Sequence, residues 1–84
     1  MKSIVIYTKD YCPYCKRAAA ILKQKNVEFQ ELDVTQDQET FDKAIAKSGC
    51  RTVPQLFVDG EYIGGHDDMV ALEAQGKLNE LLGL

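Results

Sequence analysis

The chain has 84 residues, of which 45% are hydrophobic and 27% are charged, and its formal net charge is −3. This length suits one small domain with a single core, so we expect residues 1–84 to form one domain with one surface site. The sequence has no apolar run near 18 residues and no secretory leader pattern, which predicts a cytoplasmic protein without a membrane span. The acidic balance, without a basic stripe interleaved with aromatic residues, argues against nucleic-acid binding.

The first predicted element is a strand over residues 3–8, whose continuous apolar and β-branched run is typical of a central strand covered on both faces. A helix over residues 13–25 should follow, with apolar residues at helical spacing and Asn26 as an end signal. Between the two elements, Cys12-Pro13-Tyr14-Cys15 places two thiols two residues apart. This spacing at a helix start predicts a redox centre.

The physical basis of that prediction is the start of the helix. Pro13 suits the first helical position, because its fixed φ fits there and its missing N–H would have had no partner. Cys12 should then lie just outside the first turn, where free backbone N–H groups and the positive end of the helix dipole favour a thiolate. Cys12 is therefore the predicted nucleophile. Cys15 lies one turn inside the helix, more shielded, and is the predicted resolving thiol.

A CxxC pair can also be half of a zinc site or a structural disulfide. Structural zinc normally needs four Cys or His ligands, and beyond this pair the sequence offers only Cys50 and His66. A disulfide across so short a loop would restrict the unfolded chain very little. Three cysteines are also too few for a disulfide framework, which fits a reducing compartment. These considerations favour redox chemistry and predict no metal site.

Positive charge is concentrated at the thiol end of the sequence. Residues 1–25 hold six Lys or Arg and one Asp, a balance of +5, which leaves −8 for the remainder. Such a field would attract anionic thiol substrates and stabilise a thiolate, with Lys9, Lys16 and Arg17 nearest to the motif. We interpret Lys23 and Lys25 more simply, as residues that solvate the outer face of a helix.

The second half of the chain continues the alternation of strands and helices. A strand over 27–33 should pair in parallel with the first strand through a right-handed crossover, because a helix joins them. An amphipathic helix over 37–48 should end at Gly49. Asp59-Gly60 between two apolar runs, residues 55–58 and 61–64, is a strong signal for a two-residue hairpin.

The chain should close with helical structure. A last helix is predicted from Asp67 and Asp68, which suit an N-cap and a first turn, to about Gly76. Leu78, Leu81 and Leu82 then suggest a short apolar helical tail that covers the core. The predicted order is β-α-β-α-β-β-α, an α/β domain with a four-stranded mixed sheet flanked by helices.

Three segments carry a resemblance to a known family. They are Tyr7-Thr8-Lys9 ahead of the CxxC motif, Thr52-Val53-Pro54 ahead of the third strand, and Gly64-Gly65-His66-Asp67-Asp68 ahead of the last helix. In this order and spacing, over nearly the whole chain, they resemble glutaredoxins of the small bacterial dithiol type. The resemblance implies a thioredoxin-like fold and a glutathione-dependent thiol–disulfide oxidoreductase, with glutathione as co-substrate and no bound cofactor.

The resemblance also implies how the tripeptide is bound. Pro54 should follow a cis peptide bond, so that the backbone of Val53 pairs with the cysteine portion of glutathione beside Cys12. The two glycines should allow close approach, and the following helix start should bind the γ-glutamyl carboxylate, with an Asp side chain for the ammonium group. An ordinary loop proline and a glycine turn before a capped helix would explain the same residues without a ligand.

Other positions are matched individually. By the resemblance, Lys9 reaches the glycine carboxylate and the Cys12 sulfur, and Tyr14 borders the tripeptide, although both could be plain surface residues. Arg51 could add a carboxylate contact or be a surface charge. The predicted glutathione-binding residues are Lys9, Tyr14, Thr52, Val53, Pro54, Gly65, Asp67 and Asp68. 

Cys50 and His66 are left outside the predicted chemistry. Cys50 is interpreted as a bystander, with glutathionylation or dimer formation on oxidation as the alternative. His66 is interpreted as a solvent-facing turn residue. Neither is placed in the catalytic set.

The resemblance finally implies partners. A monomer should reduce glutathionylated or disulfide-containing proteins, of which ribonucleotide reductase is one family possibility, with glutathione reductase and NADPH supplying electrons indirectly. Its potential should lie in the glutaredoxin band of about −200 to −230 mV. Two alternatives stay open at this point. A thioredoxin usually has Trp beside CGPC, whereas this chain has no Trp; a [2Fe-2S] cluster carrier usually has CGFS, and Pro13 should stiffen the loop against a cluster.

Overall fold

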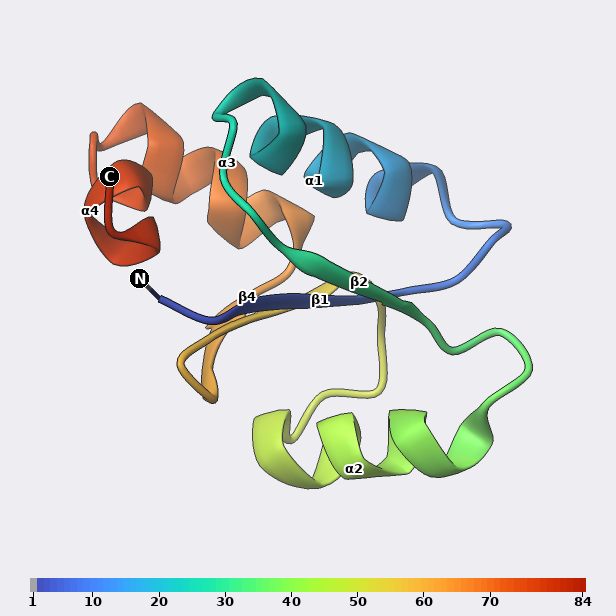
Figure 1. The fold of residues 1–84 in the computed structure, drawn as a ribbon. Coiled ribbons are helices and arrows are strands. Elements are labelled where there is room, and N and C mark those ends of the chain that lie inside the picture. The colour runs from blue at the N-terminus through green and yellow to red at the C-terminus, as the bar shows by residue number, and fades with distance from the viewer. Residues whose placement is uncertain (1) are drawn as a thin grey trace.

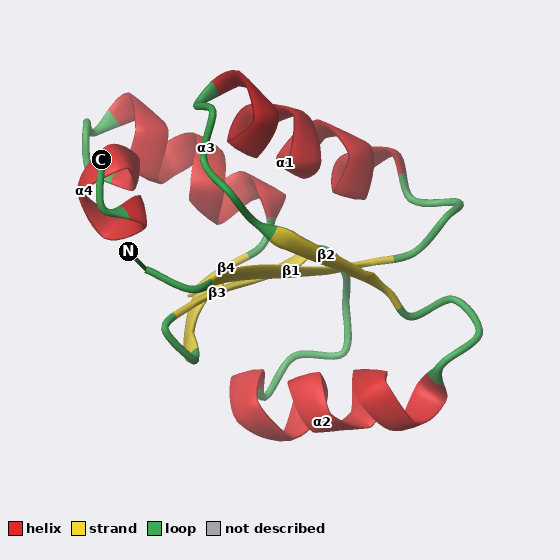
Figure 2. Ribbon diagram, in the orientation of Figure 1, coloured by secondary structure: helices red, strands yellow, loops and turns green. Residues whose placement is uncertain are grey.

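The computed structural model describes residues 2–84 and places helices on both faces of one sheet (Figures 1 and 2). In chain order the elements are β1 (Ile4–Thr8), α1 (Pro13–Gln24), β2 (Gln30–Asp33), α2 (Gln38–Ser48), β3 (Gln55–Val58), β4 (Glu61–Gly64), α3 (His66–Ala74) and α4 (Leu78–Leu82). The predicted order of strands and helices is confirmed, and the apolar tail after the last long helix forms α4.

The sheet has the order β2-β1-β3-β4, so the prediction of a central first strand is confirmed. β1 and β2 are parallel, while β1 with β3 and β3 with β4 are antiparallel. The hairpin turn has positive φ at both central residues, 51° at Asp59 and 81° at Gly60, as a two-residue turn of type I′ requires. This mixed sheet brings the end of β1 beside the start of β3, where the thiol motif and the proline segment meet.

The second strand is shorter than predicted. β2 begins at Gln30 rather than at residue 27. Val27 and Phe29 still pack against the core, but as part of the connection that follows α1. Val27 and Phe29 are apolar because they are partly buried. A partly buried loop residue and a partly buried strand residue look alike in sequence, so hydrophobic periodicity alone does not distinguish a loop from a strand here. Asn26 adopts a positive φ of 56° just after α1, consistent with its predicted role as an end signal.

The start of the last long helix also differs from the prediction. α3 begins at His66, and its N-cap is Gly65, in extended conformation with φ −98° and ψ −162°. Asp68 is the third residue of the helix, and its Oδ2 accepts a hydrogen bond from Gly65 N at 3.0 Å. The carboxylate thus caps the helix from inside its first turn, which places the boundary earlier than an Asp N-cap would. The helix ends at Ala74, before Gly76.

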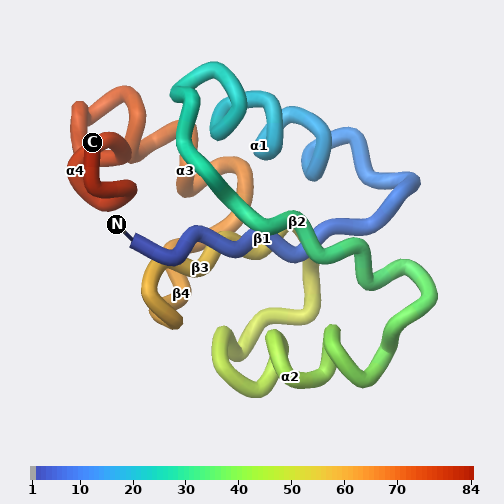
Figure 3. Tube along the Cα trace, in the orientation of Figure 1, coloured from blue at the N-terminus to red at the C-terminus, as the bar shows by residue number. Residues whose placement is uncertain are grey.

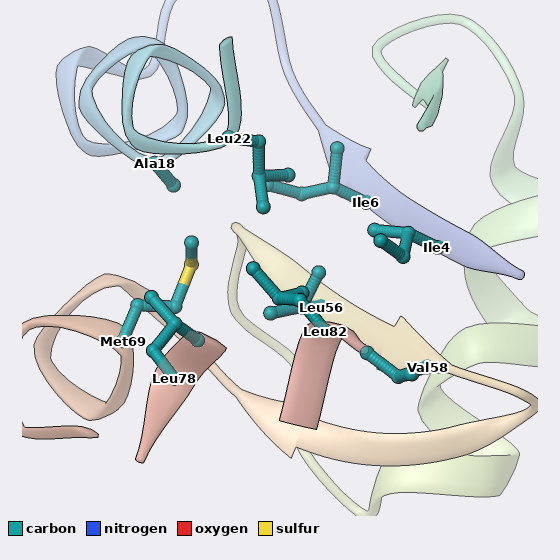
Figure 4. Packing of buried hydrophobic residues seen from close by; sticks show 9 residues of the cluster. All are labelled: Ile4, Ile6, Ala18, Leu22, Leu56, Val58, Met69, Leu78 and Leu82. Carbon is teal, nitrogen blue, oxygen red and sulfur yellow. The ribbon is translucent and has the colours of Figure 1, made fainter. Parts of the chain in front are cut away.

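The larger hydrophobic core lies between the sheet and the layer formed by α1, α3 and α4. Figure 4 shows aliphatic side chains from these helices, β1 and β3 pointing toward one another. The buried members are Ile4, Ile6, Ala18, Leu22, Leu56, Val58, Met69, Leu78 and Leu82. This core anchors α1 and therefore fixes the position of the motif at its start.

The opposite face of the sheet is covered by α2, which lies apart from the other helices (Figure 3). Its core is smaller and contains Val34, Phe41, Ala44 and Phe57. Aromatic rings extend it across the sheet, since Phe57 contacts Tyr7 edge-on at a centroid distance of 5.3 Å and lies 5.4 Å from Tyr62.

Two lysines from the first 25 residues bind the C-terminal helices α3 and α4. Lys2 Nζ donates to Leu81 O at 3.1 Å. Lys25 Nζ lies 2.7 Å from Glu73 Oε2 and also contacts Asn79. Because the Lys25 side chain is only 12% exposed, the prediction that it solvates an outer helix face is wrong; Lys23 is exposed as predicted. Among residues 2–84, no helix is long and apolar enough to cross a membrane.

Candidate active site

The sulfur of Cys12 caps α1. Cys12 is the N-cap residue, with φ −99° and ψ 107°, and Pro13 occupies the first helical position as predicted. Cys12 Sγ accepts a hydrogen bond from Cys15 N at 3.2 Å, and Cys12 N donates to Lys9 O at 3.3 Å. The backbone N–H directed at the sulfur and the positive end of the helix dipole both place positive partial charge beside Cys12 Sγ.

The second thiol is enclosed. Cys15 is 2% exposed and lies on the inner face of α1, on the same side as Ala18 and Leu22. Burial is the largest effect that raises the pKa of Cys15 to about 12, and the side-chain hydrogen bond with Cys12 adds to it, while a backbone hydrogen bond with Lys9 opposes it. Cys15 is therefore a thiol at neutral pH, and almost none of its surface is accessible.

The proline segment faces the first thiol. The Val53–Pro54 peptide bond is cis, as the resemblance implied. Cys12 Sγ lies 3.8 Å from Val53 O and donates to it. The loop that precedes this bond is held by Gln55, which is fully buried and whose Nε2 donates to Cys50 O and Thr52 O, both at 2.9 Å. A buried side chain on β3 thus fixes the backbone that meets Cys12.

A groove of about 410 Å³ runs from this point to the start of α3. Its lining consists of Tyr14, Cys50, Thr52, Val53, Pro54, Tyr62, Gly65, His66, Asp67 and Asp68. The structure therefore brings together all of the predicted glutathione-binding residues except Lys9. It adds three residues that sequence reasoning did not assign to the site: Cys50, Tyr62 and His66.

His66 is part of the groove wall, so its interpretation as a solvent-facing turn residue is wrong. Its side chain is 16% exposed. The ring lies 5.3 Å from that of Tyr14, and Nδ1 lies 3.3 Å from Asp67 Oδ1. This contact joins the first turn of α1 to the first turn of α3. The sequence signal for His66 was the predicted start of α3. Once that start is moved one residue earlier, from Asp67 to His66, His66 becomes the first residue of the helix and lies beside the CxxC motif.

Cys50 and Tyr62 form the far wall of the groove. Burial and then a side-chain hydrogen bond with Cys50 raise the pKa of Tyr62 to about 12. The Cys50 backbone is fixed too, because its N–H donates to Ser48 Oγ at 3.0 Å. The hairpin predicted at Asp59-Gly60 places Tyr62 opposite Phe57, on the face that α2 covers. The strand register set by this hairpin was the sequence signal that could have placed Tyr62 in the groove.

The two glycines serve the protein's own packing. Gly64 has φ +148°, and a Cβ there would overlap the side chain of Asp68. A Cβ on Gly65 would lie 3.2 Å from Pro54 O, which brings the start of α3 against the proline segment. The backbone N–H of Gly65 is bonded to Asp68, whereas the N–H groups expected to bind a ligand carboxylate are those of residues 66–68.

The positive charges are less concentrated than their sequence positions suggest. Lys9 Nζ lies 4.6 Å from the Phe41 ring centroid and 5.9 Å from that of Tyr11, outside the groove lining. Arg17 lies over the Tyr14 ring at 5.4 Å. By contrast, Lys2 and Lys25 bind the C-terminal helices, as described above. Arg51 is exposed and does not line the groove.

Within the described residues 2–84, no group of three or more His, Cys, Asp or Glu side chains is arranged to hold a metal ion. Cys12, Cys15 and Cys50 are all free thiols. An accessible thiol at a helix start, a buried second thiol and an adjoining groove together define a dithiol redox site on a thioredoxin-like α/β fold.

Comparison with known proteins agrees with this class. The glutaredoxin family model matches residues 4–63. Glutaredoxin 3 of Escherichia coli is 49% identical over 82 residues, which are 98% of this chain and 99% of that protein. Glutaredoxin 1 of Rickettsia prowazekii is 46% identical and covers 98% of this chain and 88% of its own length.

Solved structures give the same result. The buckwheat glutaredoxin–glutathione complex superimposes with a TM-score of 0.89 at 29% identity, covering 98% of this chain and 77% of that one. The solution structure of a glutaredoxin from Brucella melitensis has a TM-score of 0.83 at 44% identity, covering 95% and 87%. The chain belongs to the glutaredoxin family, and its activity is that of a thiol–disulfide oxidoreductase.

Proposed function

We propose that this protein uses glutathione to reduce glutathione mixed disulfides and protein disulfides. The observation that carries the proposal is the position of Cys12 Sγ, which lies between Cys15 N and Val53 O. Val53 in turn lines a groove whose volume suits a small peptide. A relative of similar fold, from buckwheat, was solved as a glutaredoxin–glutathione complex.

In the first route Cys12 acts alone. Its thiolate attacks the glutathione sulfur of a glutathionylated substrate, the substrate thiol leaves with a proton, and Cys12 keeps glutathione as a mixed disulfide. A second glutathione thiolate then attacks the bound glutathione sulfur, which releases oxidised glutathione and returns the Cys12 thiolate. Each step exchanges one disulfide for another, so two glutathione molecules supply the two electrons.

The second route also uses Cys15. Cys12 attacks a protein disulfide and forms a mixed disulfide with the target. Cys15 then loses its proton and attacks Cys12 Sγ, so that the target leaves as a thiol and a Cys12–Cys15 disulfide remains. Glutathione reduces this disulfide. The 2% exposure of Cys15 supports the assignment, because a bulky target has no access to it directly.

The groove residues hold the tripeptide in this proposal. The Val53 backbone pairs with the cysteine portion of glutathione, Tyr14 borders it, and Thr52 and Pro54 shape the segment. Asp67 at the start of α3 is exposed, and its Oδ2 can pair with the ammonium group while Oδ1 contacts His66 Nδ1. Lys9 reaches the glycine carboxylate only by leaving its position over Phe41, a weak contact to give up.

The test compares three thiol variants in glutathione-dependent reduction of a small glutathione mixed disulfide, coupled to glutathione reductase and NADPH. We expect Cys12→Ser to fall to background, whereas Cys15→Ser retains this activity but loses reduction of a protein disulfide. Cys50→Ser is the matched thiol control: it leaves Cys12 and Cys15 in place and keeps a hydrogen-bonding group beside Tyr62, so both activities should remain measurable even if glutathione binding changes. Loss of both activities in Cys15→Ser, with the fold intact, would contradict the division into two routes. No glutathione-dependent activity in the wild type would contradict the proposal itself.

A further inference from the structure

The buried thiol lies over the end of β1. Ile6 and Leu22 pack together in the core between β1 and α1. Because α1 starts beyond the C-terminal end of β1 and runs back across it, Cys15, two turns before Leu22, lies over the Thr8 end of the strand. Thr8 faces the same side as Ile6, two residues away, and is 2% exposed. A buried hydroxyl group therefore lies beneath the first turn of α1.

A carboxylate from the neighbouring strand is fixed at this hydroxyl. Glu31 on β2 is paired with Ile6 in the parallel register, so its side chain lies on the α1 face. Thr8 Oγ1 donates to Glu31 Oε2 at 3.0 Å. The negative charge of Glu31 is one of the factors that raise the pKa of Cys15, after burial and the contacts with Cys12. Glu31 is exposed, so solvent reduces this effect without abolishing it.

The remaining groups near Cys15 are a thiol, a backbone group and charged side chains that are exposed or have other partners. From α1 it meets Cys12, and from the end of β1 it meets the backbone of Lys9. Asp33 shares the face of Glu31, two residues further along β2, but its Oδ1 accepts hydrogen bonds from Thr35. Lys16 and Arg17 are exposed on α1. Among residues 2–84, Glu31 is the carboxylate that raises the pKa of Cys15, as the smallest of the causes after burial and the contacts with Cys12.

We propose that Glu31 is a positioning residue that slows the attack of Cys15 on the Cys12 mixed disulfide and so lengthens the life of the glutathionylated enzyme. This inference rests on the two routes of the proposed function. When Cys12 carries glutathione, two thiols compete. A second glutathione attacks the bound glutathione sulfur and completes the first route, whereas Cys15 attacks Cys12 Sγ, expels glutathione as a thiol and forms the Cys12–Cys15 disulfide. The carboxylate disfavours the Cys15 thiolate, so it biases this competition toward the first route.

The size of the effect follows from thiolate chemistry. A decrease of one unit in the Cys15 pKa would give about tenfold more thiolate at neutral pH, but the less basic thiolate is a weaker nucleophile, with a Brønsted coefficient of about 0.4–0.5. The net gain is therefore about threefold per unit. Because the Glu31 charge is the smallest of the named causes, we expect Glu31→Gln to accelerate closure by at most about twofold.

Glu31→Gln separates the charge from the structural role, because the amide oxygen still accepts the Thr8 hydrogen bond. Reduced protein would be mixed with oxidised glutathione, quenched with acid at intervals, and the glutathionylated and internally disulfide-bonded forms separated by mass spectrometry in a Cys50→Ser background. Glu28→Gln is the matched control, since it removes the same charge from an exposed site before β2 begins. A second readout is the ultraviolet titration of Cys15 with Cys12 and Cys50 both replaced by Ser.

Support would be faster closure and a lower Cys15 titration midpoint in Glu31→Gln, with both unchanged in Glu28→Gln. Closure that is unchanged or slower in Glu31→Gln would overturn the inference, and slower closure would instead make Glu31 a proton acceptor. These outcomes leave the proposed function intact. If the wild type forms no internal disulfide, the second route of the proposed function is wrong, and the role of Glu31 fails with it.

Discussion

The two faces of the sheet are built differently, and the candidate active site lies where both meet. On the α1 face, three helices bury an aliphatic core in which Ile6, Leu22 and Leu56 have no exposed surface. On the α2 face, one helix covers a smaller, aromatic cluster that merges into the groove through Tyr62. The difference indicates that the first face holds the thiols in place, whereas the second shapes the surface that a ligand meets.

The largest expected effect on stability comes from the α1 face. Leu22→Ala leaves a cavity under the helix that carries both thiols, and we expect it to lower the free energy of unfolding by about 3–5 kcal/mol. Denaturant unfolding of the reduced protein measures this. Leu84→Ala, at a residue that is 61% exposed, is the control and should change stability by no more than about 0.5 kcal/mol. If Leu22→Ala and Leu84→Ala lowered the free energy of unfolding equally, the buried core of this face would contribute no more to stability than an exposed residue does.

The next effect concerns the buried thiol on the same face. Folding raises the pKa of Cys15 from 9.0 to about 12, so the folded state retains a proton that the unfolded chain loses above about pH 9. This stabilisation is complete below pH 9 and is lost as the pH rises toward 12, by up to about 1.4 kcal/mol per pH unit. Unfolding of reduced protein across this range measures the slope.

Two variants identify the source of that alkaline slope. Cys15→Ala should make it shallower, even though the substitution also changes stability at neutral pH. Tyr62, whose pKa is raised in the same direction on the other face, should contribute in the same sense, and Tyr62→Phe removes its share. A slope that both variants leave unchanged would assign the alkaline loss to other groups.

The smallest expected effect concerns the α2 face. Two substitutions in α2 should both lower stability, but only one of them should also change glutathione binding. Phe41→Leu should cost about 1–2 kcal/mol of stability. It also removes the ring 4.6 Å from Lys9 Nζ, so the ammonium group no longer has to give up that contact when it moves to the glycine carboxylate. We expect a two- to fivefold decrease in KM for glutathione, the size of one cation–π contact, with kcat retained. Ile45→Val on the same helix should cost about 0.5–1.5 kcal/mol and leave KM unchanged; equal KM values would remove Phe41 from ligand binding.

Local patterns were sufficient for most of the fold. The continuous apolar run of β1, the Asp59-Gly60 turn and Gly49 after α2 each have a local physical cause, and the structure has the predicted element at each place. The start of α3 was misplaced because Asp68 caps the helix from its third position, a choice that depends on the packing of Gly65 against Pro54. Sequence spacing alone does not contain that contact.

The site divides in the same way. Cys12, Cys15 and the proline segment were recognisable because each motif is continuous in sequence. Tyr62 and His66 come to the groove from β4 and α3, so their place depends on strand register and helix packing. Lys25 was misjudged for a similar reason, since Glu73, its partner, lies 48 residues away. Long-range partners decide whether a lysine is solvated or enclosed.

The sulfur of Cys12, the proposed nucleophile, is also the acceptor that caps α1. In the proposed mechanism Cys12 enters a disulfide, and a disulfide sulfur is a weaker acceptor for the Cys15 amide, so we expect the first turn of α1 to be less firmly capped in that form. The amide proton of Cys15 should therefore report the redox state of Cys12. Its NMR chemical shift and exchange rate should follow the enzyme through reduced, glutathionylated and internally disulfide-bonded forms, without any added label.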